Sequence, residues 1–469
     1  MKAGKAFSLC TVFLSALCCR STFAVEEAAG KPKPVSYYGA VRPILVKSCQ
    51  GCHQPAKASA KIVLSDYGQL IKAVHDDEKV VIPGKPEESL LYKEIVPHGE
   101  KPPSMPKEAE PLSGTEVGVI KRWILEGAKD DTPETAKDNV SPENPPQYQG
   151  LPVITGLDFS SDGKYLAVSG YHEVLLHKAD GSGLEARLVG VAQRIQALSF
   201  SPDGKRLAVA AGLPARRGEV QIWDVESRKL KISAPSTFDT LYGVKWSHDA
   251  KLVSFGAADN TLRAIDSKTG KQVFFNGAHN DWVLDTVFSK DSSHLISVSR
   301  DRSMKLMKVD AQQFIDNITS ITPGALKGGL ISIDRHPGKD ELLIGGADGT
   351  PKIYRMFRQK ARKIGDDFNL IRNFAKVPGR IFSTEYSADG GRIVVGSSKD
   401  GEGLVRVYQE GDAKMLWEVK TAGGIYTCAF NHDGKTVAAA GFQGKVLLID
   451  AASGKIIKEL IPVPLKAAG

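Results

Sequence analysis

From about residue 151 onward, hydrophobic and polar positions recur in a fixed order. A short strand ends in an aromatic or similar residue, a polar turn follows, and then come a strand of small apolar residues and a third strand. The turns lie at Phe159–Gly163, Phe200–Gly204, Trp246–Asp249, Phe288–Asp291, Arg335–Gly338, Tyr386–Gly390 and Phe430–Gly434. Their spacing of roughly 40–50 residues is the period of propeller blades, each built from four strands. The pattern predicts an all-β propeller of seven blades over residues 151–469.

Residues 35–130 have helical periodicity instead. The first predicted helix has its apolar face at Tyr38, Val41, Ile44, Leu45 and Cys49. Pro43 predicts that this helix begins or kinks nearby, because proline removes a backbone donor. A second helix is predicted over Ser89–Ile95. The third is predicted to begin at Ser113, with Glu116 completing a capping box, and its apolar stripe is Val117, Ile120, Trp123 and Ile124. The pattern predicts a small all-α domain.

The remaining segments read as a leader and two connectors. Lys2 and Lys5 precede an apolar run that is too short to span a membrane readily. Ala24 ends a segment with small residues at the positions that a signal peptidase recognises. We therefore expect a signal peptide over residues 1–24, cleaved near Ala24, with an uncleaved anchor as the alternative. Residues 25–34 form a spacer, and the proline-rich residues 131–150 form a linker. The expected mature protein is soluble and exported to the periplasmic or cell-envelope side, without a transmembrane segment.

Charge adds a modest asymmetry between the two predicted domains. The chain has 62 basic and 54 acidic residues, but residues 25–150 contain 16 basic and 19 acidic ones. No dense Lys/Arg run with interleaved aromatic residues occurs, so nucleic-acid binding is not indicated. The basic propeller half is suited to docking against the acidic half or against an acidic partner, and ordinary surface variation explains the asymmetry equally well.

The strongest chemical motif is Cys49-Gln50-Gly51-Cys52-His53. This C-x-x-C-H run is the attachment motif of a c-type haem, because two thiols reach the two vinyl groups and the adjacent histidine ligates the iron. A redox dithiol or half of a zinc site has the same Cys spacing, but the chain contains no second Cys pair. Three other cysteines leave with the signal peptide, and Cys428 is expected to be a small buried residue of an inner strand.

A second axial ligand would complete the haem iron. Met105 is the leading candidate, because it lies in a proline-bounded loop downstream of His53. A Met/His pair raises the reduction potential and suits electron transfer. His98 and, more distantly, His75 are rival candidates for this ligand. The alternative interpretation of Met105 is that it is a surface or packing residue and not a ligand.

These residues resemble the planctomycete-type cytochrome c domain over about 95 positions. The resemblance lies in Arg42–Leu45 before the Cys49–His53 motif, in Ser89–Tyr92, in Met105-Pro106, in Leu112-Ser113 and in Trp123–Ala128. Lys107 departs from the family, which often has a second proline there. The resemblance implies one haem c held covalently by Cys49 and Cys52, with His53 as the proximal ligand and Met105 as the distal ligand.

The repeated units resemble WD40 repeats. Val220–Asp224 carries the Trp-Asp dipeptide, and His279 and Asp301 match the histidine and turn aspartate of a well-formed blade. Most other blades lack the terminal tryptophan. His279 and Asp301 are expected to pin strands by side-chain hydrogen bonds and not to catalyse. The predicted fold is a small all-α, class-I-like cytochrome c domain followed by a seven-bladed WD40-like propeller.

Three functions follow from this reading. The first is an exported monohaem cytochrome that transfers single electrons, an electron carrier more than an enzyme, whose propeller docks a redox partner protein or complex. The second is a cytochrome–propeller oxidoreductase with a second cofactor or substrate site on the propeller. The third is an interaction scaffold without a redox role. The scattered propeller histidines and tryptophans lack ligand spacing, which disfavours the second function.

Overall fold

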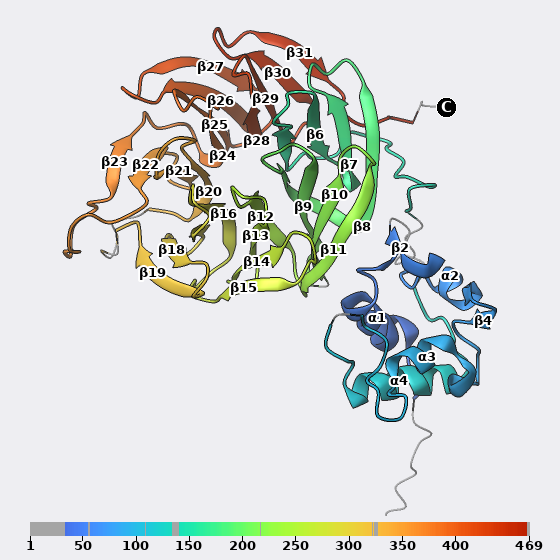
Figure 1. The fold of residues 1–469 in the computed structure, drawn as a ribbon. Coiled ribbons are helices and arrows are strands. Elements are labelled where there is room, and N and C mark those ends of the chain that lie inside the picture. Colours follow the sequence, from blue (N-terminus) through green and yellow to red (C-terminus); the bar gives the residue numbers. More distant parts are fainter. Residues whose placement is uncertain are drawn as a thin grey trace, which may run out of the picture.

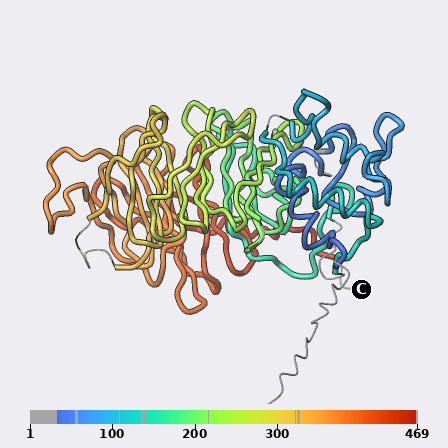
Figure 2. Tube along the Cα trace, turned by 90° about the horizontal axis from the view of Figure 1, so that it is seen from below, coloured from blue at the N-terminus to red at the C-terminus, as the bar shows by residue number. Residues whose placement is uncertain are grey.

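The computed structural model describes residues 33–54, 57–107, 109–133, 140–215, 217–320, 322 and 327–466. A helical unit lies beside the rim of a ring of antiparallel sheets (Figure 1). Seen from the side, the ring is a disc and the helical unit adjoins one end of it (Figure 2). The expected signal peptide, cleavage site and most of the spacer lie outside the described residues.

The helical unit contains the three predicted helices and one that the sequence did not reveal. The unpredicted helix, α2, is only six residues long and buries a single residue, Leu70, so it leaves little periodicity in the sequence. The elements are η1 (Tyr37–Val41), α1 (Arg42–Ser48), β1 (His53–Gln54), β2 (Lys57–Ala58), η2 (Ser59–Lys61), α2 (Tyr67–Lys72), β3 (Val74–His75), β4 (Glu78–Lys79), η3 (Pro86–Glu88), α3 (Leu90–Ile95) and α4 (Gly114–Leu125).

Local sequence signals account for how these helices begin. Pro43 lies in the first turn of α1, where its missing N–H costs nothing. Ser113 caps α4, and the reciprocal bond from Glu116 completes the predicted capping box. The prediction for Tyr38 was wrong: Tyr37 is the buried residue and packs against Trp123 at 5.4 Å between ring centroids. The wider turn of η1 before α1 displaces the inward face by one residue.

The sheets form seven four-stranded units, as the repeat period predicted. The long strand β8 serves two of them, because residues 184–189 pair with β7 and residues 194–200 pair with β9. The first two blades consist of β5 (Leu157–Phe159), β6 (Tyr165–Ser169), β7 (Tyr171–Lys178), β8 (Leu184–Phe200), β9 (Arg206–Leu213), β10 (Arg217–Asp224) and β11 (Lys229–Thr237).

The other five blades are separate sheets of four consecutive strands. Blades 3 and 4 are β12 (Leu241–Trp246), β13 (Leu252–Ala257), β14 (Leu262–Asp266) and β15 (Gln272–Asn276), then β16 (Val283–Phe288), β17 (His294–Ser299), β18 (Met304–Lys308) and β19 (Gln313–Asn317). Blades 5 to 7 are β20 (Leu330–Arg335), β21 (Glu341–Gly346), β22 (Lys352–Arg355) and β23 (Leu370–Asn373), then β24 (Arg380–Tyr386), β25 (Arg392–Lys399), β26 (Glu402–Gln409) and β27 (Met415–Thr421), then β28 (Ile425–Phe430), β29 (Thr436–Gly441), β30 (Val446–Asp450) and β31 (Ile456–Leu460).

The repeated Ser-x-Asp turn has one physical role in five of the blades. In the first blade, Ser160 Oγ donates to Asp162 Oδ1 at 2.7 Å and accepts the Tyr165 backbone N–H at 2.9 Å. Four other turns repeat this pair of bonds, at Ser201, Ser247, Ser289 and Ser387. In the degenerate fifth unit, His336 Nδ1 accepts the backbone N–H groups of Gly338 and Lys339 instead. The turn motif therefore closes the tight hairpin between the first two strands of a blade.

The ring closes where blade 7 meets blade 1. The inner strands β5, β8, β12, β16, β20, β24 and β28 contact one another in sequence around the ring. At the closure, the Ile154 N–H donates to Gly441 O at 3.0 Å, and Tyr148 forms a parallel bridge with Leu465. The end of the linker and the end of the chain are thus joined at the rim of the propeller.

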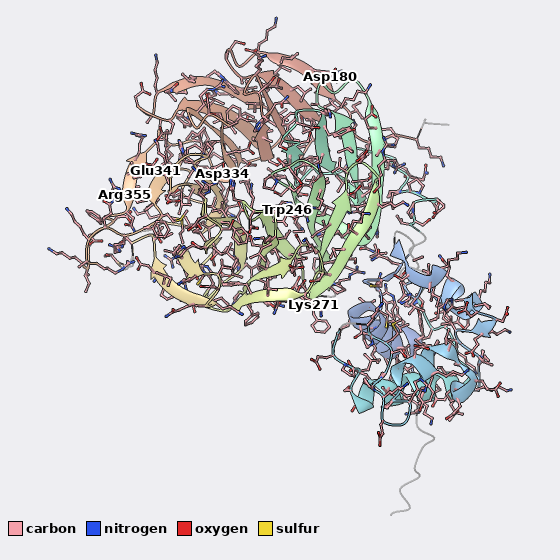
Figure 3. All side chains as sticks on the ribbon, viewed as in Figure 1. Asp180, Trp246, Lys271, Asp334, Glu341 and Arg355 are labelled. Atoms are coloured by element: carbon pink, nitrogen blue, oxygen red, sulfur yellow. The ribbon has the colours of Figure 1, made fainter. Side chains whose placement is uncertain are left out.

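Carboxylates on the inner strands join neighbouring blades. Four of them accept a backbone N–H from the following blade at 2.6–3.0 Å: Asp158 from Phe200, Asp285 from Ile333, Asp334 from Tyr386 and Glu385 from Phe430. Lys245 lies among these four side chains, and Asp334 lies near the middle of the ring in Figure 3. Burial raises the pKa of Asp158 and of Asp285 to about 6.

The sequence predicts that two insertions among the repeats, Leu213–Arg217 and Arg362–Lys376, are loops, but both contain strand residues. Arg217 was predicted to lie in a loop, but it begins β10 and pairs with the buried carboxylate of Glu219. Leu370–Asn373, within a second expected loop, forms β23, the fourth strand of blade 5. Arg217 pairs with a buried carboxylate, and β23 pairs with β22. Neither partner can be identified from the local sequence.

The described residues include no helix with the length and apolar character that a membrane crossing requires.

Candidate functional site

The Cys-x-x-Cys-His motif forms a tight turn at the end of α1. The Cys49 N–H still donates to Leu45 O at 2.9 Å, and the N–H groups of Cys52 and His53 both bond to Cys49 O at 3.1 Å. The thiols are not joined as a disulfide; Cys49 is half-buried and Cys52 is exposed. Burial raises the pKa of the Cys49 thiol to about 12. This turn directs both thiols and the histidine ring toward one side of the helix end.

The His53 ring is buried and oriented by a backbone carbonyl. Its Nδ1 lies 3.3 Å from Ile62 O, so Nδ1 is the protonated nitrogen and Nε2 keeps its lone pair. Burial lowers the pKa of His53, which favours the neutral imidazole. A neutral imidazole whose second nitrogen donates to a carbonyl is the usual form of a metal-ligating histidine.

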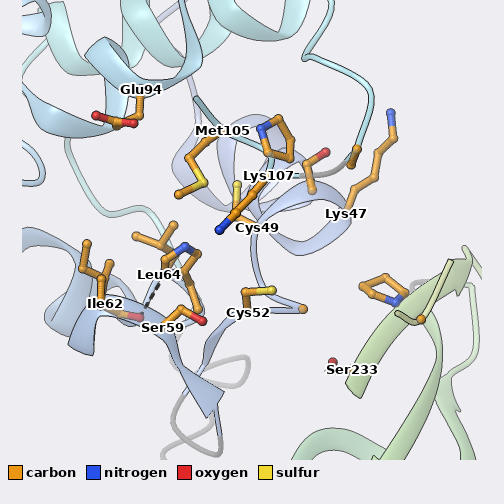
Figure 4. A pocket seen from close by; sticks show the side chains of 18 of the residues that line it. Lys47, Cys49, Cys52, Ser59, Ile62, Leu64, Glu94, Met105, Lys107 and Ser233 are labelled. Carbon is orange, nitrogen blue, oxygen red and sulfur yellow. Dashed lines mark hydrogen bonds between the residues drawn. The ribbon is translucent and has the colours of Figure 1, made fainter. Parts of the chain in front are cut away.

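A cavity of about 720 Å³ opens beside this turn. Such a volume lies within the range of small-molecule and cofactor sites. Its apolar lining comes from the core of the helical unit: Ile62, Leu64, Val80, Leu91 and Ile95. In Figure 4 the sulfur-bearing side chains of Cys49, Cys52 and Met105 surround the same space. The donors and the apolar lining fit a porphyrin attached by two thioethers.

Met105, the candidate distal ligand, lines this cavity. Its backbone N–H donates to Glu94 O at 2.9 Å, which ties the loop to α3, and its half-buried side chain packs against the helical core. His98 is exposed, bridges to Lys101, and does not line the cavity. His75 does line the cavity, so it is the rival ligand that the geometry favours over His98.

Part of the cavity lining comes from the propeller, and sequence reasoning missed it. The lining includes residues 231–235 of β11 and residues 268–271 in the turn between β14 and β15. These segments are about 180 and about 220 residues away from the motif in sequence. The charge asymmetry between the domains was the one signal that pointed to contact between them.

The other candidate chemistry in the propeller is structural. His279 Nδ1 lies 2.9 Å from Asp301 Oδ2, and its Nε2 lies 2.8 Å from Ser297 Oγ. This relay of side-chain hydrogen bonds confirms the role predicted for His279 and Asp301. Cys428 is buried in β28, as expected. Within the described ranges, no three or more His, Cys, Asp or Glu residues are grouped so that they could hold a metal ion.

Comparisons with known proteins agree with the two-part architecture. Residues 49–109 match the family described as Planctomycete cytochrome C, and residues 270–307 match the WD domain, G-beta repeat. The chain thus combines a cytochrome-like segment with WD40 repeats in an all-β propeller.

The curated relatives are similar over part of their length. The chain is 24% identical to Periodic tryptophan protein 2 of Saccharomyces cerevisiae over 297 residues, 56% of this chain and 30% of that protein. It is 30% identical to Eukaryotic translation initiation factor 3 subunit I of Coccidioides immitis over 176 residues, 34% of this chain and 49% of that protein. The chain therefore spans 30% of the first relative's length and 49% of the second's.

Proposed function

We propose that this protein is an exported monohaem c-type cytochrome that carries single electrons, with its propeller as the docking scaffold for a redox partner. The observation that carries the proposal is the joint position of Cys49, Cys52, His53 and Met105 around one apolar cavity. In the proposed domain division, residues 1–24 are the signal peptide, 35–130 the cytochrome domain, 131–150 the linker and 151–469 the propeller.

Each of these side chains has a distinct part in the proposal. Cys49 and Cys52 would hold the haem covalently, His53 would be the proximal ligand and Met105 the distal ligand. The haem would supply the iron that alternates between two oxidation states. The Ile62 carbonyl orients the His53 ring, the Glu94 carbonyl holds the Met105 loop, and the apolar lining keeps water away. Thioether and imidazole ligation together favour a raised reduction potential.

Half-buried aromatic rings and exposed side chains at the propeller surface support the docking role. Trp282 stacks on Tyr242 at 5.7 Å between ring centroids, and the Arg300 guanidinium lies 4.2 Å above the Trp282 ring. Phe238, in the connection between blades 2 and 3, is 71% exposed. Side chains of these types dominate the binding energy of many protein interfaces.

The proposal is tested by producing the full chain in a host that matures c-type cytochromes. Haem staining after denaturing electrophoresis and reduced-minus-oxidised spectra should reveal one covalent haem per chain. The Cys49→Ser/Cys52→Ser variant should lose the stain, whereas Cys428→Ser, the matched control, should keep it. Wild-type protein without covalent haem would overturn the proposal.

An interaction scaffold without a redox role is the second candidate, because the relatives include a protein named as a subunit of a translation factor. The same experiment separates the two, because a pure scaffold would carry no haem. A second chromophore, or haem reduction by substrate with this protein alone, would instead indicate an oxidoreductase with its own site on the propeller.

A further inference from the structure

The haem-attachment turn lies directly against the propeller. A Cβ atom built on Gly51, between the two cysteines, would lie 2.6 Å from the backbone oxygen of Ser233 in β11. That separation is shorter than real Cβ contacts, and a strand carbonyl cannot swing aside, so the close approach requires glycine here. The short strand β2, just after the motif, also contacts β11. The attachment turn and the outer strand of blade 2 therefore pack backbone against backbone.

The strand that contacts the attachment turn, β11, is held on its inner side by the buried carboxylate of Glu219. Ser233 Oγ donates to Oε1 of Glu219, which is fully buried and paired with Arg217. Ile232 is buried in the core of blade 2. β11 is also the outermost strand of its sheet, with Pro235 on it, so its outer edge is available to another surface. This wall of the cavity is thus a rigid part of the propeller.

The propeller also brings positive charge to the cavity. Lys231, Lys268 and Lys271 line it from blades 2 and 3, and Figure 3 places Lys271 on the edge next to the helical unit. Across the part of the chain that the structure describes, no carboxylate forms a salt bridge with any of these three lysines. From the helical unit, Lys47 and Lys107 also line the cavity, and Glu94 is the one carboxylate among the described lining residues. Lys47 is paired with Glu116 at 3.0 Å, so the positive charge at the edge of the apolar cavity comes mainly from the propeller lysines.

We propose that the haem pocket is a two-domain pocket, in which β11 and the β14–β15 turn form the wall beside the attachment turn and their lysines raise the haem reduction potential. This proposal rests on the proposed covalent haem. Oxidation of the iron adds a positive charge, and nearby ammonium groups disfavour that charge. The packed strand would also restrict access to the haem on the side of the attachment turn, where Gly51 meets Ser233. The propeller would thereby set a property of the haem and not only dock a partner.

The charge part is tested in the full-length haem protein. Lys231→Gln/Lys268→Gln/Lys271→Gln should lower the midpoint potential in a spectroscopic redox titration at low ionic strength, and the shift should shrink at high salt. The matched control, Lys251→Gln/Lys290→Gln/Lys308→Gln, removes the same charge from exposed positions on blades 3 and 4 that do not line the cavity. Equal potentials in the two triple variants would overturn the proposal.

The packing part is tested with Gly51→Ala, which forces the attachment turn away from Ser233. Covalent haem should be retained, because the two cysteines and the histidine remain, while reduction by ascorbate should become several-fold faster and the potential should move. The control is Gly118→Ala on α4, where an added Cβ meets nothing within 4 Å and should change neither. If Gly51→Ala matches this control, the two-domain pocket is wrong; if it does not fold, the lysine variants decide.

These outcomes separate the two proposals. Wild-type protein without covalent haem overturns both the electron-carrier function and the two-domain pocket. Covalent haem in all variants, with wall variants indistinguishable from their controls, overturns the two-domain pocket alone.

Discussion

His279 Nδ1 lies 2.9 Å from Asp301 Oδ2, across the end of blade 4. The same carboxylate oxygen accepts the Asn280 N–H at 2.9 Å, and the other oxygen accepts the Ser303 hydroxyl. Hydrogen bonding to His279 holds the pKa of Asp301 well below its usual range, although burial opposes this, and burial lowers the pKa of His279. Asp301 is therefore ionised and His279 neutral at pH 7.

Asp301→Ala should destabilise the propeller by about 2 kcal/mol, because it removes the carboxylate that accepts from the buried His279 ring and from the Asn280 N–H. Chemical denaturation followed by tryptophan fluorescence measures the loss. Asp310→Ala, an exposed aspartate in the same blade with a side chain 76% exposed, is the control and should be near neutral. An equal effect in both variants would contradict the role assigned to the relay.

The pH dependence of this relay is also defined. His279 has a lowered pKa when folded, so the unfolded chain binds its proton first and the stabilisation is lost as pH falls below about 6.5. The depressed pKa of Asp301 adds a further loss below about pH 4. Asp301 raises the pKa of His279 against the effect of burial, so the stability difference between wild type and Asp301→Ala should not shrink between pH 7 and pH 4. It should shrink only below about pH 4, where the unfolded chain protonates Asp301, and denaturation at several pH values will reveal this.

The sequence predicted the parts of the fold that local chemistry encodes. A tight turn is predicted from Ser160 and Asp162, and a helix start from Ser113 and Glu116. The haem-attachment motif is contiguous, from Cys49 to His53. Arg217 and β23 were missed because their roles depend on partners: a buried Glu219 and a neighbouring strand. The propeller wall of the cavity was missed for the same reason, since Gly51 and Ser233 meet only in the folded chain.

Lys245 is the cation among four inner-strand carboxylates, so Lys245→Met should cost about 3 kcal/mol at pH 7.5. The pKa of Asp158 and of Asp285 is raised to about 6, above the unfolded value of about 3.9, so the folded state binds protons first as pH falls. Their electrostatic cost is therefore relieved between pH 7 and pH 5. The loss caused by Lys245→Met should be smaller at pH 5 than at pH 7.5 in denaturant titrations.

The matched control for that comparison is Lys251→Met, which removes an exposed lysine of the same blade. It should have little effect at either pH, because exposed ion pairs contribute little. A Lys245→Met loss that does not change with pH would show that packing, and not charge, explains the role of this lysine.

Ser113→Ala should destabilise the helical unit by about 1 kcal/mol, because the Ser113 hydroxyl accepts the Glu116 N–H at the start of α4. α4 carries Trp123, whose ring packs against Tyr37, so loosening of its first turn should also lower the unfolding midpoint in circular dichroism at 222 nm. Thr115→Ala, at an exposed position in the same turn, is the control and should be neutral or slightly stabilising. Equal losses in the two variants would exclude a specific capping contribution.

Met105→Ala should remove the low-spin methionine-ligand spectrum of the haem protein and lower its midpoint potential, because a thioether ligand favours the reduced iron. Covalent haem should remain, since Cys49 and Cys52 are unchanged. His98→Ala is the matched control, because His98 is exposed and away from the cavity, and its spectrum should equal that of wild type. His75→Ala tests the rival on the cavity lining. A wild-type spectrum in Met105→Ala together with an altered one in His75→Ala would assign the distal position to His75 and overturn the Met105 assignment.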